Sequence, residues 1–437
     1  MQLLIIVVAI ALQIFLTYKK VSPFLSLLIV ALLAGLAFGI DPETLLKKTV
    51  KTGVGNTLGD VALVICLGAI LGKILELSGA ASQIANTLIR SFGIKNIQWA
   101  VLLTGFLVGI PLFYNAGFII LVPLVFSIAR TAGLPLLYVA IPMAASLSTT
   151  HCFLPPHPGP MFLVGAFNAD IGKTLMYGLL ISVPVVIIAG PLLGRVLKRM
   201  NVEIPPSTNI EVVEKDRPGA FESFVLALLP VLLIAISVVA DSFFPGNSIL
   251  NKIIFFLGDA TVALLISVLL SVIFLGLLKG RSMQQVMQWL GDSIAGIAVI
   301  LLIITAGGVF KQVLVDSGTA DYITSFSKEW NIHPLLFAWL VTALLRVAIG
   351  SATVAGITAA GIVSPLLASG TVSPELLVLA VGTGSVFCSH VNDSGFWIFK
   401  EFFNLSLKQT FLSWTVMETI ISILGLAGVM ALSLFVE

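Results

Sequence analysis

The chain has 437 residues, of which 58% are hydrophobic and only 10% are charged, and its formal net charge is +2. Soluble globular domains contain about 25% charged residues, so most of this surface must face something other than water. The small, scattered positive charge gives no indication of nucleic-acid binding, and Cys66, Cys152 and Cys388 form no spaced pair typical of a disulfide framework or a zinc site.

Apolar runs of about 20 residues, long enough to cross a ~30 Å hydrocarbon layer as helices, follow one another along the chain. They are continuously apolar, whereas the strands of a membrane barrel would alternate. The first run lacks a basic segment ahead of it, so we expect it to be retained as a helix. For the first half we predict helices at 2–18, 22–40 and 57–78, interrupted segments at 97–131 and 136–168, and a helix at 173–198.

Residues 200–220 contain three prolines and most of the local charge, which predicts a solvent-exposed, cytoplasmic linker. The second half then repeats the order of the first. We predict helices at 221–244, 255–279 and 290–316, interrupted segments at 333–368 and 375–402, and a last helix at 408–435.

An internal repeat supports this division into residues 1–199 and 221–437. When the chain is shifted by 239 residues, identical residues coincide without a gap over more than 70 positions. The coinciding pairs include Ser78-Gly79 with Ser317-Gly318, Ala116-Gly117 with Ala355-Gly356, Ser146 with Ser385, and His151 with His390. Shared hydrophobicity alone does not explain matched glycines, serines and a histidine.

The distribution of basic residues predicts the orientation. If 97–131 and 333–368 are hairpins that enter and leave on one face, ten full spans remain, five in each half. An odd number per half gives the repeats opposite topologies. Fifteen Lys and Arg residues then lie on one face and seven on the other, with Arg346 buried between them. The basic face should be cytoplasmic, so both termini should be periplasmic or exterior.

Four breaks interrupt the apolar segments, two in each half. Non-helical backbone is tolerated at membrane depth only where it lines a cavity or is buried in protein, and paired breaks in inverted repeats indicate a transporter's binding site. The alternative is that these prolines and glycines merely kink helices or allow close packing. The breaks are Pro111–Gly117, His151–Pro160, Gly350–Gly356 and Ser389–Gly395.

Arg346 precedes the third break and needs a partner, because an arginine within the membrane costs about 2.5–3.5 kcal/mol on insertion scales. Its planar fork suits a substrate carboxylate. The alternative is a structural ion pair with Asp393 or Glu418. We expect further substrate contacts from Ser351 and Thr353 in this third break and from Asn115 in the first.

Asp393 lies in the fourth break beside Ser389, His390 and Asn392, which are candidate substrate contacts. A low-dielectric cavity favours the protonated form of a carboxylate, as a proton carrier requires. Asp393 could instead be the N-cap of the next helix. His151 and His390, equivalent in the repeat, are candidates for binding both substrate and protons, although single membrane histidines often only pack. Glu418 is a second candidate proton site or an interhelical hydrogen-bond partner.

No nucleotide-binding or metal-ligand motif is present, so the sequence supports no cofactor and no primary pump. A channel or facilitator and an intramembrane enzyme are the rival classes. Buried titratable groups argue against the first, and the symmetric repeat argues against the second.

At these same residues the chain resembles the gluconate/proton symporter family. The resemblance runs along nearly the whole chain. The shared motifs are His151-Cys-Phe-Leu-Pro-Pro-His-Pro158, Ala306–Gly318, Gly350-Ser-Ala-Thr-Val-Ala355 and Ser389-His-Val-Asn-Asp-Ser-Gly-Phe-Trp397. The resemblance implies proton-driven transport of gluconate, a related sugar acid or, in one branch, D-serine across the inner membrane, and the fourth motif looks more like the gluconate branch. It further implies a dimerising scaffold and an elevator-like transport domain, mainly 97–168 and 333–402.

The chain departs from the family pattern at Asn115, where many members have an acidic residue. If that acid carries the coupling proton elsewhere, this protein must use another group, couple differently or prefer another substrate.

Overall fold

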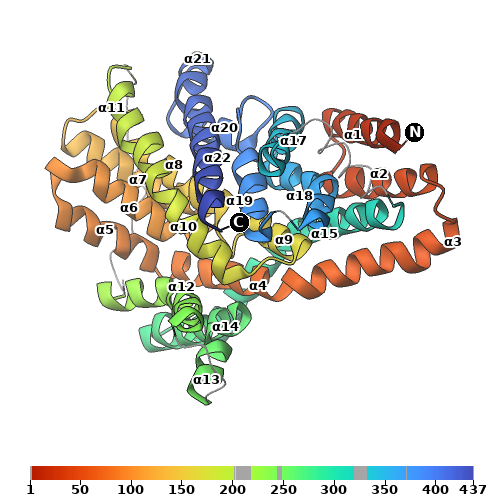
Figure 1. The fold of residues 1–437 in the computed structure, drawn as a ribbon. Coiled ribbons are helices and arrows are strands. Elements are labelled where there is room, and N and C mark those ends of the chain that lie inside the picture. Colours follow the sequence, from red (N-terminus) through yellow and green to blue (C-terminus); the bar gives the residue numbers. More distant parts are fainter. Residues whose placement is uncertain are drawn as a thin grey trace.

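The computed structural model describes residues 2–200, 202, 218–243, 249–318, 332–370 and 372–436, and all regular elements in these ranges are helical (Figure 1). Within them, eight helical segments are long and apolar enough to cross a membrane, or nine if the bent pair Ala80–Phe92 and Ile94–Gly109 is one span. Six shorter apolar helices accompany them. The protein is therefore a multi-pass helical membrane protein, although length and apolarity alone do not identify the ten spans expected from the sequence.

The helices of the first half follow the predicted order closely. Most of the predicted linker, residues 203–217, lies outside the described residues. The first-half elements are α1 (Gln2–Tyr18), α2 (Pro23–Ala37), α3 (Pro42–Thr44), α4 (Lys51–Leu77), α5 (Ala80–Phe92), α6 (Ile97–Gly109), α7 (Tyr114–Thr131), α8 (Leu136–Phe153), α9 (Pro158–Phe167), α10 (Ile171–Ile187) and α11 (Leu193–Leu197).

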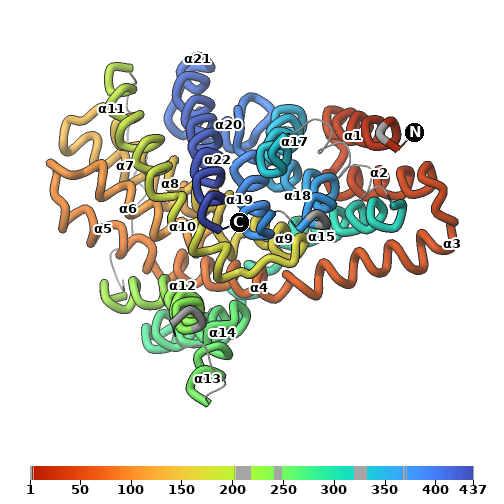
Figure 2. The backbone as a smooth tube through the Cα atoms, in the orientation of Figure 1, coloured from red at the N-terminus to blue at the C-terminus, as the bar shows by residue number. Residues whose placement is uncertain are grey.

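The second half contains the same kinds of element. Helices α12, α13 and α14 lie together along one edge, at the bottom of Figures 1 and 2. The second-half elements are α12 (Ala220–Phe243), α13 (Ile249–Gly258), α14 (Ala260–Ser271), α15 (Met283–Asp316), α17 (Pro334–Ile349), α18 (Ala352–Val363), α19 (Pro374–Gly384), α20 (Ser394–Phe402), α21 (Leu407–Thr410) and α22 (Val416–Val436).

Four helix predictions needed correction. Helix α4 starts six residues before the predicted 57, and it continues a helical segment that begins at Pro42. Helix α5 was not predicted, because it is amphipathic and interrupts the apolar pattern with polar residues; it starts after Gly79 and stops at Gly93, both with positive φ. The predicted helix 255–279 is divided at Asp259, whose side chain caps α14 by accepting from two backbone N–H groups. Helix α15 starts seven residues before the predicted 290, because Ser282 and Gln285 form a capping box.

Helices α4 and α15 pack along each other, and this is the most extensive contact between two elements in the described chain. Glycines allow the close approach: a Cβ on Gly53 would lie 2.8 Å from the Gly308 carbonyl oxygen, and one on Gly308 would lie 2.0 Å from Thr57 Oγ1. A hydrogen bond of 2.6 Å from Thr49 to Asp316 joins the two helical segments at one end.

All four interrupted segments contain a break near the predicted place. The chain leaves helical geometry between α6 and α7, α8 and α9, α17 and α18, and α19 and α20. The helices that flank these breaks include the most completely buried ones, α8, α9, α18 and α19. The first three breaks are therefore largely buried in protein, whereas the fourth has exposed residues, Val391, Asn392 and Ser394. Non-helical backbone at membrane depth is tolerated where it is buried or lines a cavity.

Candidate functional site

A cavity of about 330 Å³ lies among the breaks. The start of α7, the end of α8, the α17–α18 break, the segment before α20, and the first turns around α22 all contribute to its wall. Most of the predicted binding and coupling residues line it: Asn115, His151, Arg346, Ser351, Thr353, Asn392, Asp393 and Glu418. Ser389 and His390 are the predicted residues that do not.

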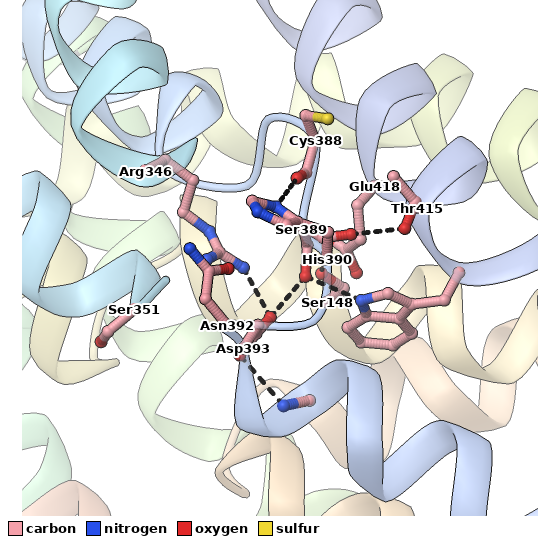
Figure 3. A network of polar contacts seen from close by, with 12 residues as sticks. Ser148, Arg346, Ser351, Cys388, Ser389, His390, Asn392, Asp393, Thr415 and Glu418 are labelled. Atoms are coloured by element: carbon pink, nitrogen blue, oxygen red, sulfur yellow. Dashed lines mark hydrogen bonds and ion pairs between the residues drawn. The ribbon is translucent and has the colours of Figure 1, made fainter. Parts of the chain in front are cut away.

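Arg346 and Asp393 form an ion pair in this cavity, with 2.5 Å between Nη2 and Oδ2 (Figure 3). The arginine lies in the last turn of α17 and its side chain is only 2% exposed. The other oxygen of Asp393 accepts from the Gly395 backbone N–H at 3.0 Å, which caps α20. Asp393 is thus both the N-cap and the ion-pair partner that the sequence offered as alternatives.

The two breaks of the second half are held against each other. Asn392 donates to the Val347 carbonyl oxygen at 2.8 Å. Gly350, which ends α17 with φ +90°, lies so close that a Cβ there would be 2.3 Å from the Asn392 carbonyl oxygen. A side chain at this position would be strained in its backbone and would also separate Arg346 from the segment that carries Asp393.

Ser389 holds the Asp393 carboxylate in place. Its hydroxyl donates to Asp393 Oδ2 at 2.5 Å and accepts from the Trp414 indole N–H at 2.7 Å, while its carbonyl accepts from Thr415 at 2.6 Å. Figure 3 shows the part of this chain of contacts that runs from Arg346 through Asp393 to Ser389. The carboxylate therefore has a fixed position although it lies in a non-helical segment.

Several polar atoms on cavity residues are buried without a hydrogen-bond partner among the described residues. They are Nε and Nη1 of Arg346, Oε1 of Glu418 and the hydroxyl of Tyr114. The second oxygen of Glu418 accepts from Ser148 at 2.9 Å. Buried polar groups in proteins nearly always have hydrogen-bond partners. We therefore expect a bound molecule, or another conformation of the protein, to supply partners for these atoms.

The histidines are arranged differently from the predicted symmetric pair. His157 Nε2 donates to the Gly109 carbonyl oxygen at 2.8 Å, and its Nδ1 lies 3.4 Å from Nδ1 of His151. If both rings are neutral, His157 Nδ1 accepts from His151, which leaves His151 Nε2 as an acceptor. His390 instead donates from Nδ1 to the Cys388 carbonyl oxygen at 2.9 Å.

The sequence did not single out Tyr114, Ser148 and Trp414, although they belong to the cavity wall. Tyr114 could have been found from the repeat, because the shift of 239 residues places it on Thr353, a predicted contact. No comparable signal marks Ser148 or Trp414, whose partners are distant in the sequence. Over the residues that the structure describes, no group of three or more His, Cys, Asp or Glu side chains could hold a metal ion.

Comparison with solved structures supports the helical fold. The Alcanivorax borkumensis YdaH transporter superposes with a TM-score of 0.68 over 94% of this chain and 97% of its own, at 17% identity. Neisseria gonorrhoeae MtrF, described as one of a class of antimetabolite efflux pumps, superposes with a TM-score of 0.67 at 18% identity over 93% of this chain and 94% of its own.

Comparison with characterised sequences identifies the family. The chain is 50% identical to a high-affinity gluconate transporter of Escherichia coli K12 over all of both chains, and 46% identical to the Gnt-II system L-idonate transporter of the same strain over 99% of each. A gluconate permease of Pseudomonas aeruginosa PAO1 is 44% identical, with 98% of this chain and 96% of its own aligned. The family model for GntP family permeases matches residues 1–435. The chain therefore belongs to the GntP family of permeases and is a transporter, not an enzyme.

Proposed function

We propose that this permease carries gluconate or a closely related sugar acid across the inner membrane together with protons. The observation that carries the proposal is Arg346, a buried guanidinium on the cavity wall that has two N–H positions without a partner in the described chain. An arginine fork can bind a carboxylate through two parallel hydrogen bonds. The cavity volume of about 330 Å³ lies within the usual range for a small-molecule site.

The relatives narrow the substrate class. Two of the similar proteins are named for gluconate and one for L-idonate. These acids have the same carbon chain and differ in configuration at a single carbon. A six-carbon polyhydroxy acid is therefore the substrate class we propose, in preference to D-serine or another small carboxylate.

Coupling to protons would arise because Asp393 and the substrate carboxylate compete for Arg346. Asp393 occupies one side of the guanidinium, so an ionised Asp393 and a substrate carboxylate share one positive charge. Protonation of Asp393 removes the competing negative charge and should raise the affinity for the substrate anion. Binding linkage is reciprocal, so substrate should also favour protonation. Glu418, buried beside Ser148, is a second candidate, and His151 is a third.

We further propose that the two halves are inverted repeats and that 97–168 and 333–402 move together against a scaffold containing α4 and α15, in a homodimer. The packing of α6 on α8 has a counterpart in the packing of α17 on α19, at equivalent places in the two halves. The cavity also reaches Thr17 and Pro23, which flank the basic residues Lys19 and Lys20. With those lysines cytoplasmic and both termini periplasmic, the cavity opens toward the cytoplasm.

Uptake into proteoliposomes tests the function. With the external pH below the internal pH, radiolabelled gluconate should accumulate above its external concentration, and an uncoupler should abolish the accumulation. Equilibration without accumulation would identify a facilitator and refute proton coupling. Transport of D-serine with no transport of gluconate or idonate would refute the proposed substrate class.

A further inference from the structure

Tyr114, the first residue of α7, has its ring fixed from two sides. The ring stacks on Phe118, one helical turn later, with 5.6 Å between centroids and an interplanar angle of 23°. Trp414 contacts it edge-on, also at 5.6 Å. Only 8% of Tyr114 is exposed, yet the residue lines the cavity. Packing therefore determines where its hydroxyl lies.

The packing of Tyr114 requires only its aromatic ring. Its hydroxyl is buried and has no hydrogen-bond partner in the part of the chain that the structure describes. A phenylalanine would fill the same volume without leaving a buried polar group unsatisfied, which is costly. The repeat places another hydroxyl residue, Thr353, at the equivalent position of the second half, and it also lines the cavity. A role in binding therefore explains the Tyr114 hydroxyl better than a role in folding does.

Tyr114 and Arg346 are related through a defined chain of contacts. Arg346 pairs with Asp393, Asp393 accepts from Ser389, Ser389 accepts from Trp414, and the Trp414 ring contacts Tyr114. Three side chains thus link the guanidinium to the phenol, and both residues line the same cavity. A ligand with a charged group at one end and hydroxyl groups along its length could contact both.

We propose that Tyr114 determines specificity by hydrogen-bonding one hydroxyl of the substrate's polyol chain while Arg346 binds the carboxylate. The inference rests on the proposed transport of a sugar acid. A phenol can both donate to and accept from an alcohol. A buried group that pairs with a substrate hydroxyl discriminates against analogues that lack it, because the group is then left unpaired.

The test measures equilibrium binding of D-gluconate and of a series of monodeoxy gluconates, each lacking one hydroxyl, to purified wild-type and Tyr114→Phe proteins. We expect Tyr114→Phe to weaken gluconate binding by roughly 3- to 10-fold, the range for one neutral hydrogen bond. The wild-type protein should bind one analogue of the series more weakly than gluconate by a similar factor. The Tyr114→Phe protein should bind that analogue and gluconate with about equal affinity. Tyr177→Phe, which removes a hydroxyl from α10 outside the cavity, is the matched control and should bind like wild type.

Two results would overturn the role of Tyr114 while leaving the proposed function intact. One is unchanged gluconate affinity in Tyr114→Phe. The other is an equal loss for gluconate and for every deoxy analogue, which would indicate a structural effect on the cavity. Failure of the wild-type protein to bind any sugar acid would instead overturn the proposed function, and this inference with it.

Discussion

The two halves of the chain contribute different chemistry to one cavity. The first half supplies neutral polar groups, including Tyr114, Asn115, Ser148 and His151, and no carboxylate or guanidinium. The second half supplies all three formally charged groups of the wall, which are Arg346, Asp393 and Glu418.

The repeat makes this contrast sharper. In the register of 239 residues, Arg346 corresponds to Leu107 and Asp393 corresponds to Leu154. Helix-disrupting residues of the breaks coincide between the halves, Gly117 with Gly356, Pro111 with Gly350 and Pro156 with Gly395, whereas the ion pair has no counterpart. The breaks are thus common to both halves, whereas the charged groups of the wall are confined to the second. The predictions below test whether binding and coupling depend mainly on the second half.

The largest effect is expected for Arg346→Lys. The positive charge is kept, but an ammonium cannot reproduce the planar fork. Losing one charge-assisted hydrogen bond costs about 1.5–3 kcal/mol, so gluconate affinity should fall by roughly 10- to 150-fold in equilibrium binding. Arg195→Lys is the matched control, because Arg195 contacts Gln98 away from the cavity. Wild-type affinity in Arg346→Lys would show that the guanidinium does not contact the substrate.

A complete loss of coupling, with substrate binding retained, is expected for Asp393→Asn. Asparagine mimics the protonated carboxyl group and is an equally good N-cap, so α20 should still form. Binding should stay within about tenfold of wild type and lose its pH dependence. Exchange of labelled for unlabelled gluconate should persist, whereas accumulation against a gradient should disappear.

Asp259→Asn is the control for that substitution. Asp259 also caps a helix, α14, but it lies outside the cavity, so the variant should accumulate gluconate normally. If Asp393→Asn concentrates substrate with normal pH dependence, Asp393 is not the coupling site. Glu418 would then be the acid to test next.

Local sequence signals predicted the framework of the site but not all of its contacts. Gly350 and Pro111 indicated breaks because glycine and proline are the least favourable residues in a helix interior, and a buried arginine requires a partner whatever the fold. The Arg346–Asp393 pair could therefore be named as an alternative from the sequence. Long-range contacts were harder to predict: Ser148 and Glu418 are 270 residues apart, and nothing in either local sequence indicates the other.

The surroundings of the histidines were also hard to predict from the sequence. Their variants give the smallest effect that we predict. The repeat makes His151 and His390 equivalent, which suggested equivalent roles. In the structure His151 lines the cavity beside His157, whereas the His390 ring donates to the Cys388 carbonyl oxygen and does not line it. His151 lies in the last turn of α8, whereas His390 lies in the non-helical segment before α20, and an identical residue in the repeat does not reveal this difference.

We therefore expect His151→Gln to weaken gluconate binding by about threefold, the effect of one neutral hydrogen bond, and His390→Gln to change it by less than about twofold. Glutamine retains a donor and an acceptor in each case, so neither variant leaves a neighbouring carbonyl without a possible partner. Binding of labelled gluconate to both purified variants under one set of conditions measures the difference directly. Equal losses would restore the symmetric pair that the repeat suggested and would place His390 in the binding site during some other step of transport. A larger loss for His390→Gln would contradict the assignment, because a residue outside the cavity would then control binding more strongly than one on its wall.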